Sequence, residues 1–462
     1  MDDRGMTMGI EKPVTIALLG AGARGELNLA SLAKRYPDQL RFVAVAEPHP
    51  GRREQFARNF AIPPANAFNS WQELLAKPRL AHAVINTLPC RMHYESGMAA
   101  LQAGYHQLLE KPMALSPGQC LVLADAAREA GLVLAIPLQS RYTRIYARVR
   151  QLLDQGTVGD LMNIDCAENI GYWHFIMSYV RGIHHHSSLS HSFLLAKGVH
   201  DLDLVGWFAG APARRVSSFG SLQFFTEANA PPGAPARCLD GCPAEKTCVF
   251  SAIKQYLKPG RPAIPFKLAA GQSLEVLADV IRLPRFRTLA SIVTQDDLSP
   301  AGIRKALSET NHGRCVFHCP NDVVDHQTVS IEHENGVTTS FSLSGFSVVW
   351  ERTLNLHGSK GEIRSADFSG RLETRTFHPA RARTERIPYH AIIHGGGDTA
   401  ILLEFAKAAA KEDPASILTR ADDCVESHLL CFAAEKARRE NRVVEMDEFR
   451  AQARAEARLI RQ

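Results

Sequence analysis

The sequence contains no apolar run long enough to cross a membrane as a helix. Its first residues, MDDRGMTMGIEKP, lack the apolar core of a secretory signal, so we expect a cytoplasmic protein. Ten cysteines in 462 residues are too few for a disulfide scaffold, and in a reducing compartment most of them are expected to be free thiols. These absences leave an ordinary globular protein as the expectation.

A large excess of charge of one sign is also lacking. The 53 Lys and Arg residues face 48 Asp and Glu residues, which gives a formal net charge of +5. Aromatic residues make up 7% of the chain, and no basic stripe interleaved with aromatics is present, so no nucleic acid partner is expected. The length and the hydrophobic content of 45% suffice for two domains with a large core.

What the sequence does contain is a nucleotide-binding pattern near its start. Residues 14–25 read VTIALLGAGARG, an apolar strand pattern that ends in G-x-G-x-x-G and leads into a helical pattern. Gly20 permits the tight turn, Gly22 lets the backbone approach a pyrophosphate, and Gly25 allows close packing of helix and strand. Glu47 ends the next strand, where a carboxylate accepts the ribose hydroxyls. This order of elements predicts a dinucleotide cofactor.

Glu47 favours NAD over NADP, because a carboxylate repels a 2′-phosphate, although Arg52 and Arg53 lie close to it in sequence. The candidate cofactor-binding residues all come from the first part of the chain. They are Gly20, Gly22, Ala23, Arg24, Gly25, Glu47, Thr87, Leu88, His93, Glu110, Lys111 and Gln139.

Short apolar strands alternate with helical patterns up to about residue 136, which predicts a parallel sheet covered on both faces. The expected strands are Val14–Leu19, Arg41–Ala46, Ala83–Leu88, His106–Leu109 and Val133–Ile136. The expected helices are Glu26–Lys34, Arg52–Asn59, Trp71–Leu75, Tyr94–Ala103 and Pro117–Ala130. We therefore expect an α/β Rossmann domain over residues 1–136.

Residues 137–462 have the texture of an α+β domain with an open, mainly antiparallel sheet. The expected elements are a helix, Ile145–Gln155, and the strands Met162–Asn169, Arg214–Leu222, Asp325–Glu334, Thr338–Leu343 and Arg352–His357. Pro and Gly clusters and closely spaced cysteines interrupt this pattern at about residues 225–323, which we interpret as an insertion in this second domain.

Two short motifs carry candidate chemistry. Glu110-Lys111-Pro112 ends a predicted strand of the first domain, where open α/β sheets bind ligands, so Lys111 can donate to a substrate hydroxyl or carbonyl. A surface ion pair between Glu110 and Lys111 is the alternative. Residues 198–203, GVHDLD, place His200 at a helix start, where a histidine can act as general acid or base near neutral pH. A histidine that caps a helix or fills the core is the alternative there.

With these motifs, the sequence resembles the glucose–fructose oxidoreductase / inositol dehydrogenase (Gfo/Idh/MocA) superfamily. The residues that carry the resemblance are Gly20–Gly25, Glu47, Glu110-Lys111-Pro112, His200–Asp203 and His357–Gly361. The resemblance implies an NAD(H)-dependent oxidoreductase that acts on a hydroxyl of a sugar, cyclitol or derivative. It also implies Lys111 as the residue that orients the substrate, His200 as the acid/base, and a homodimer or homotetramer that forms through the open sheet.

One position departs from the family pattern. Family dehydrogenases often carry an aspartate four residues before the histidine, where this sequence has Ala196, so a Lys–Asp–His proton relay cannot be carried over whole. Tyr172 is a candidate catalytic group in its place. His174, Arg181 and Asp201 are candidate substrate contacts, and a polar loop at the domain boundary is the alternative for His174 and Arg181.

Some members of the superfamily are redox-neutral glycosidases. They oxidise a sugar hydroxyl with bound NAD, eliminate the aglycone, add water and reduce the ketone again. The missing aspartate and the insertion keep this activity as the alternative function. A binding or regulatory protein without catalysis is a third hypothesis.

A cysteine pattern lies within the insertion. Cys238, Cys242 and Cys248 lie in RCLDGCPAEKTC, and Cys315 and Cys319 follow in GRCVFHC. Thiolates favour zinc, and Cys315 or Cys319 would complete a tetrahedral structural site, with Cys315 as our choice. The spacing is looser than paired C-x-x-C motifs, so unligated thiols are the alternative.

Overall fold

The computed structural model describes residues 12–257, 292–294, 297–367, 369–387 and 396–462. The chain divides into two compact units. The first contains residues 1–142, 396–425 and 453–462, and the second contains residues 143–395 and 426–452. The boundary expected near residue 136 stays a prediction, and the structure adds that the chain returns to its first unit near the C-terminus. Among the described residues, no helix has the length and apolar character needed to span a membrane.

The first unit is built on a six-stranded parallel sheet with the strand order β3-β2-β1-β4-β5-β6. Its strands are β1 (Val14–Leu19), β2 (Leu40–Ala46), β3 (Ala67–Phe68), β4 (Ala83–Asn86), β5 (His106–Leu109) and β6 (Leu134–Ala135). This order is that of a dinucleotide-binding Rossmann sheet, so the predicted fold of this region is confirmed. Strand β3 was not predicted, because two residues are too short to show a pattern.

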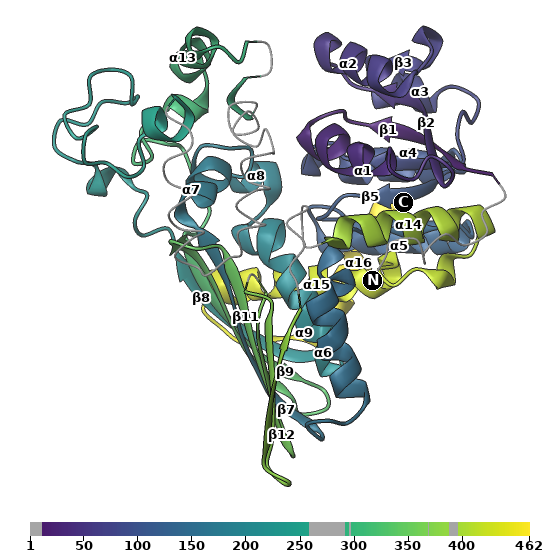
Figure 1. The fold of residues 1–462 in the computed structure, drawn as a ribbon, viewed down its shortest axis with the longest axis vertical. Coiled ribbons are helices and arrows are strands. Elements are labelled where there is room, and N and C mark those ends of the chain that lie inside the picture. Colours follow the sequence, from purple (N-terminus) through teal and green to yellow (C-terminus); the bar gives the residue numbers. More distant parts are fainter. Residues whose placement is uncertain (1–11, 258–291, 295–296, 368, 388–395) are drawn as a thin grey trace. The chain divides into compact units, whose positions relative to one another are not determined.

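Helices cover this sheet, and they follow the apolar periodicity of the sequence. They are η2 (Ala23–Ala30), α1 (Ser31–Ala33), α2 (Pro50–Phe60), α3 (Trp71–Leu75), α4 (His93–Gln102) and α5 (Pro117–Glu129). Pro50 and Pro117 stand in the first turns of α2 and α5, where a missing N–H costs nothing. The returning helix α14 (Gly397–Lys411) packs against η2 and β1 and is the yellow-green helix of Figure 1.

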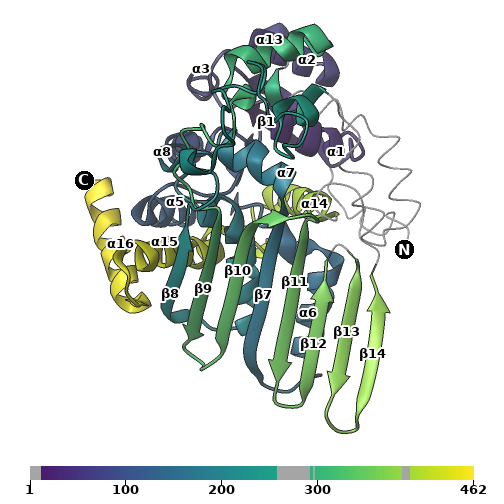
Figure 2. The ribbon, with the colours of Figure 1, turned by 90° about the vertical axis from the view of Figure 1, so that its left-hand side faces the viewer.

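The second unit is built on a nine-stranded sheet with the order β14-β13-β12-β11-β7-β10-β9-β8-β15. Figure 2 shows the strands from β14 to β8 of this order side by side. The strands of this sheet are β7 (Leu161–Gly171), β8 (Ala213–Ser221), β9 (His326–His333), β10 (Thr338–Ser347), β11 (Glu351–Gly358), β12 (Gly361–Ala366), β13 (Arg371–Thr376), β14 (Arg381–Arg386) and β15 (Val444–Glu445). All neighbours are antiparallel except the pair β7 and β10, which confirms a mainly antiparallel sheet.

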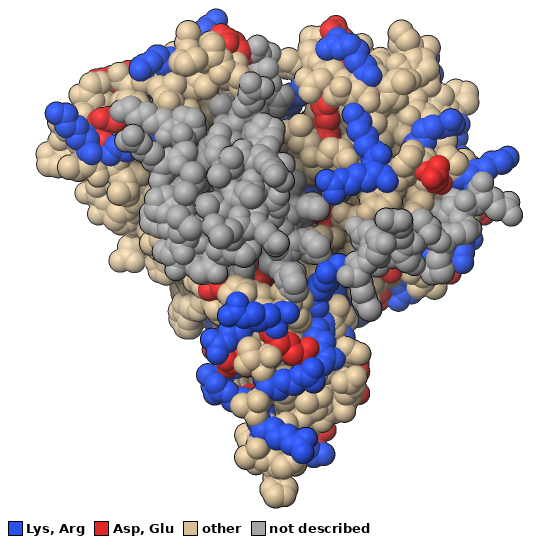
Figure 3. Space-filling view, viewed as in Figure 1, with Lys and Arg blue, Asp and Glu red and all other residues tan. Residues whose placement is uncertain are grey.

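Buried and exposed residues alternate along β9 and β10, so one face of this sheet packs inward and the other meets solvent. Helix α9 (Val199–Ala209) packs on β7 from the covered side. Charged residues of both signs are mixed over the lower part of the sheet in Figure 3. On β12 and β13, for example, Arg364 and Arg375 both pair with Glu362.

The predicted insertion lies between β8 and β9. Its residues 258–291 and 295–296 lie outside the described part of the chain. The described part contains η9 (Ile253–Leu257) and α13 (Pro300–Glu309). Tyr256, Ile303 and Leu307 form a small apolar core with Met177, so the insertion packs against the segment that carries Met177.

Candidate functional site

The glycine-rich turn has the geometry that its sequence predicts. Gly20 takes a φ of +90°, and Thr87 Oγ1 donates a hydrogen bond to its carbonyl oxygen at 2.7 Å. A Cβ on Gly25 would lie 2.2 Å from that oxygen and 2.6 Å from Thr87 Oγ1, so only glycine permits this approach. A Cβ on Gly22, in contrast, would meet no atom within 4 Å. This open space, at the start of η2, fits a pyrophosphate at a helix N-terminus.

The acid that follows β2 is held beside the turn. Glu47 is buried, and its two carboxylate oxygens accept hydrogen bonds from the backbone N–H groups of Ala21, at 2.8 Å, and His49, at 3.0 Å. Arg53 donates to the Glu47 carbonyl oxygen at 2.6 Å, whereas the buried Nε of Arg52 has no hydrogen-bond partner in the described part of the chain. The Glu47 carboxylate is therefore fixed beside the glycine turn, and Arg52 Nε is a nearby buried donor without a hydrogen-bond partner among the described residues.

A half-buried charge cluster, the Arg24 cluster, joins three segments of the first unit. Arg24 Nε lies 2.5 Å from Glu110 Oε1, and its two Nη atoms form a fork with Asp398 at 2.8 and 2.9 Å. Burial lowers the pKa of Arg24, but Asp398 and Glu110 raise it by more, so the guanidinium stays charged. Glu110 Oε2 also accepts the backbone N–H of Lys111 at 3.2 Å. The cluster thus ties the glycine turn to the segment that carries Lys111.

Two other predicted cofactor residues differ in their surroundings. His93 lies between two backbone carbonyls, with Nδ1 at 2.6 Å from Pro112 O and Nε2 at 2.7 Å from Leu88 O. Burial lowers the pKa of His93, while these carbonyls oppose that shift. This placement favours a brace for the Lys111 segment over a cofactor ligand. Gln139 is buried, and its Oε1 has no hydrogen-bond partner among the described residues, which leaves an acceptor for a ligand amide.

In the second unit, a buried network of charges surrounds Glu168 on β7. Lys197 Nζ lies 3.3 Å from Glu168 Oε1, and Arg352 Nε lies 2.7 Å from Glu168 Oε2 and 2.8 Å from Asp201 Oδ1. Trp350 donates its indole N–H to Glu168 at 2.8 Å, and Lys197 Nζ lies 4.1 Å from the centre of the Trp350 ring. We call these residues the Glu168 network.

The network reaches two of the predicted substrate residues. His174 stacks on Trp350, with ring centres 4.6 Å apart. Burial raises the pKa of Asp201 to about 7, and its Oδ2 has no hydrogen-bond partner within the described residues. His200, the residue before Asp201 on α9, is buried with 4% of its surface exposed. His174, His200 and Asp201 therefore lie on elements that meet at this network.

The two remaining predicted residues face the insertion. The Tyr172 ring packs near the Phe250 ring, with centres 6.1 Å apart, and burial raises the pKa of Tyr172. Arg181 is one of the largest fully buried side chains, and it donates to the carbonyl oxygens of Arg314 at 2.7 Å and Phe250 at 2.9 Å. The predicted substrate contact of Arg181 stays a prediction, and its guanidinium is occupied by hydrogen bonds to the insertion.

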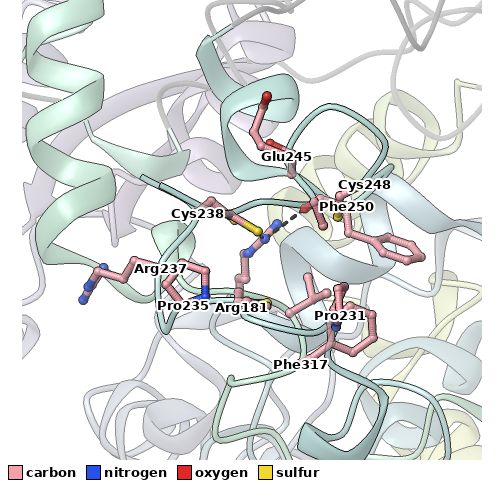
Figure 4. Close-up of a pocket in the computed structure, with 15 residues that line it drawn as sticks. Arg181, Pro231, Pro235, Arg237, Cys238, Glu245, Cys248, Phe250 and Phe317 are labelled. Atoms are coloured by element: carbon pink, nitrogen blue, oxygen red, sulfur yellow. Dashed lines mark hydrogen bonds between the residues drawn. The ribbon is translucent and has the colours of Figure 1, made fainter. Parts of the chain in front are cut away.

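Arg181 lines a pocket that also brings the predicted zinc ligands together. Cys238, Cys242, Cys248 and Cys315 all line this pocket, and Figure 4 shows Arg181 directed toward Cys238. The described His, Cys, Asp and Glu residues form no group of three or more that is already spaced to hold a metal ion. The zinc site is therefore unconfirmed, although the chosen cysteines share one cavity.

The sequence analysis did not identify several charged residues of the Arg24 cluster and of the Glu168 network. Lys197, Glu168, Arg352 and Asp398 were not among the predicted site residues. A signal existed for Lys197, because it is a single charge inside the apolar stretch FLLAKGV. The partners of these residues are distant in sequence, so no local pattern connects them.

The first unit is also similar in sequence to known proteins. Residues 14–137 match the model of an oxidoreductase family with an NAD-binding Rossmann fold. The chain is 30% identical over 151 residues to the D-glucoside 3-dehydrogenase of Escherichia coli (strain K12), a match that covers 32% of this chain and 41% of that protein. It is 26% identical over 219 residues to the scyllo-inositol 2-dehydrogenase (NAD(+)) of Bacillus subtilis (strain 168), covering 46% of this chain and 59% of that protein.

The matches cover 38%, 42% and 41% of the first three curated relatives, so the chain spans about two fifths of their length. Likeness of fold extends further. The structure of levoglucosan dehydrogenase in complex with NADH and levoglucosan superimposes with a TM-score of 0.66 at 16% identity, over 94% of this chain and 100% of that one. Residues 14–137 therefore match the NAD-binding Rossmann domain of the Gfo/Idh/MocA oxidoreductase family, and the solved structure adds likeness of fold over most of the chain.

Proposed function

We propose that this protein is an NAD(H)-dependent oxidoreductase that moves a hydride at a carbon bearing a hydroxyl group of a sugar, cyclitol or derivative. The observation that carries the proposal is the glycine turn, with open space at Gly22 and the fixed carboxylate of Glu47 beside it. The named relatives, a glucoside dehydrogenase and an inositol dehydrogenase, support the substrate class.

The glycine turn and Glu47 would hold the pyrophosphate and the ribose of NAD. When bound, NAD+ supplies the hydride acceptor. Lys111, at the carboxyl end of β5, orients the reacting hydroxyl as a donor. His200 accepts the hydroxyl proton as general base, a role that suits imidazole near neutral pH. Tyr172 is the remaining catalytic candidate.

Substrate contacts are assigned to His174 and Asp201. His174 presents a ring held by Trp350, and Asp201 retains a carboxyl oxygen that no described residue binds. Burial raises the pKa of Asp201, so this carboxyl group is protonated more readily than an exposed aspartate and can then donate to a sugar hydroxyl as well as accept from one. Arg181 stays a predicted contact outside this set, because its guanidinium is occupied by hydrogen bonds to the insertion.

The activity is tested by incubating the protein with NAD+ and a panel of sugars and cyclitols while NADH absorbance is followed. Lys111→Ala and His200→Ala should each lower turnover at least about 100-fold, the lower range for a lost acid or base. Lys77→Ala, at an exposed lysine of the first unit, is the matched control. Full activity in both site variants would contradict the assignment.

The redox-neutral glycosidase is not favoured, because the relatives named above are dehydrogenases. The same panel includes aryl glycosides to test it. Aglycone release without net NADH would replace the proposed activity by that alternative.

We further propose a homodimer or homotetramer in the cytoplasm, with a structural zinc ion at Cys238, Cys242, Cys248 and Cys315. The solvent-facing side of the nine-stranded sheet supports the first point, and ten cysteines that form no disulfide support a reducing compartment. Light scattering gives the mass of the assembly, and a monomer at micromolar concentration would contradict it.

A further inference from the structure

Glu168 is a carboxylate on β7 with none of its side chain exposed, and it gathers donors from two other segments of the second unit. Its Oε1 accepts the indole N–H of Trp350 at 2.8 Å and lies 3.3 Å from Nζ of Lys197, on η7 (Leu194–Gly198). Its Oε2 lies 2.7 Å from Nε of Arg352, on β11. Since a buried charge is costly unless opposite charges and hydrogen bonds compensate it, this one anion fixes the positions of its donors.

Two of these donors lead on to candidate substrate residues. The Trp350 ring stacks on the His174 ring, with centres 4.6 Å apart and an angle of 23° between the ring planes. Arg352 Nε donates a hydrogen bond to Asp201 Oδ1 at 2.8 Å. Each of the two donors therefore connects Glu168 to one candidate substrate contact.

The third donor acts on the helical segment that carries His200. η7 continues directly into α9, so Lys197 and Asp201 lie four positions apart on one segment, with His200 between them. This spacing is close to one helical turn and places both side chains on one side of the segment. Lys197 contacts Glu168 directly, and Asp201 reaches it through Arg352. The segment is thus tied to β7 at positions before and after His200.

The charges of the Glu168 network depend on one another. Glu168 lies close to both Lys197 and Arg352, and Asp367 Oδ2 lies 3.8 Å from Arg352 Nη1. Neutralising Glu168 removes an anion that both cations contact, and breaking a buried ion pair on one side is strongly destabilising. The two cations should then shift toward other carboxyl groups. Lys197 Nζ lies 4.1 Å from the centre of the Trp350 ring, so a shift of Lys197 changes the support of that ring.

We propose that Glu168 is a positioning residue of the substrate site. Through Trp350 it holds the ring of His174, and through Arg352 it holds the carboxyl group of Asp201. Glu168 itself touches no substrate, because its side chain is fully buried and donors lie within 3.3 Å of both of its oxygens. The inference rests on the proposed oxidoreductase function, in which His174 and Asp201 contact the sugar or cyclitol.

The first test uses the full chain and the sugar or cyclitol that it oxidises best. Glu168→Gln keeps the shape of the side chain and removes its charge. The KM for the substrate should rise at least about tenfold, the factor that corresponds to one charged hydrogen bond to the substrate. The Kd for NADH in fluorescence titration should stay at the wild-type value. An unchanged KM, or an equal loss of NADH affinity, would overturn the positioning role.

Matched variants separate positioning from a general effect on the sheet. Glu362→Gln, on β12, makes the same change at a carboxylate that pairs with Arg364, and it should leave the KM unchanged. In a background with His174→Ala and Asp201→Asn, Glu168→Gln should raise the KM by a smaller factor than in the wild type. The reason is that the side chains through which Glu168 acts are already altered there. Equal factors in both backgrounds would refute the proposal.

A spectroscopic test needs no activity. The chain has four tryptophans, so labelling with fluorotryptophan gives few fluorine NMR signals, and Trp350→Phe identifies the signal of Trp350. Glu168→Gln should shift this signal, and Lys197→Met should shift it more than Lys197→Arg. A Trp350 signal that stays in place in Glu168→Gln would overturn the proposal, and Lys197→Met gives the same decision where Glu168→Gln does not fold. A wild-type protein that oxidises no sugar or cyclitol with NAD+ would contradict the oxidoreductase function, while the fluorine spectra still decide the role of Glu168.

Discussion

The last two glycines of the nucleotide turn, Gly22 and Gly25, give a matched pair of substitutions that should differ in their effect on stability. Gly25→Ala places a methyl group 2.2 Å from the Gly20 carbonyl oxygen and 2.6 Å from Thr87 Oγ1, both far inside van der Waals contact. The backbone must shift to relieve this overlap, and overpacking of this kind costs about 1–3 kcal/mol of unfolding free energy. Gly22→Ala meets nothing within 4 Å, and Gly22 has an ordinary φ of −75°.

Gly22→Ala should therefore leave the unfolding free energy unchanged or raise it by about 0.5 kcal/mol, because alanine restricts the unfolded chain. Its methyl group occupies the space that the pyrophosphate would approach, so affinity for NADH should fall at least tenfold, which is about 1.4 kcal/mol. Gly25→Ala should lose both stability and NADH binding.

Urea unfolding followed by circular dichroism measures the stability, and NADH fluorescence titration measures the affinity. The reasoning is refuted if Gly22→Ala binds NADH as tightly as the wild type. It is equally refuted if Gly25→Ala unfolds at the wild-type urea concentration, since the close approach at Gly25 would then be unnecessary.

Three further predictions concern buried charges. Asp398→Asn removes one of the two carboxylates that contact Arg24 and leaves Glu110. It should lower the free energy of unfolding by about 2 kcal/mol, the range of one charged hydrogen bond. An unchanged midpoint of urea unfolding would show that the Arg24 cluster does not stabilise the fold. Burial raises the pKa of Glu168, but Arg352 and Lys197 lower it by more, so the stability that this carboxylate contributes is lost as the pH falls. Lys197→Met removes one of these cations, so the loss of stability should begin at a higher pH than in the wild type. Burial lowers the pKa of His191 from 6.5 to about 4, so between these two values the unfolded state binds a proton that the folded state does not. The free energy of unfolding should therefore fall as the pH is lowered from 6.5 to 4. His191→Gln should flatten this part of the plot of unfolding free energy against pH.

The sequence predicted most of the fold because apolar periodicity is a local signal. The strands of the Rossmann sheet and the strands β7 to β11 appear close to their expected positions. Strand β14 was missed, because its sequence RARTER is polar throughout and nearly every residue is exposed. Backbone pairing with β13 makes this segment a strand, and its side chains show no pattern from which that pairing could be predicted.

The start of the first helix was also misplaced. The pattern predicted a helix from Glu26, whereas η2 begins at Ala23 as a π-helix directly behind the glycine turn. A π-helix changes the spacing of side chains, so a search at the α-helical period does not find its boundaries. The predicted roles of Lys111, His200 and Tyr172 stay predictions.

The sequence by itself determined the cofactor turn, since Gly20, Gly22, Gly25 and Glu47 follow two adjacent strands and their spacing is a local property of the chain. Only the tertiary structure decided the charge partners, because they come from segments that are far apart along the chain. Asp398 pairs with Arg24 although the two residues are 374 positions apart, and a sequence pattern contains no information about which distant carboxylate will neutralise a half-buried guanidinium.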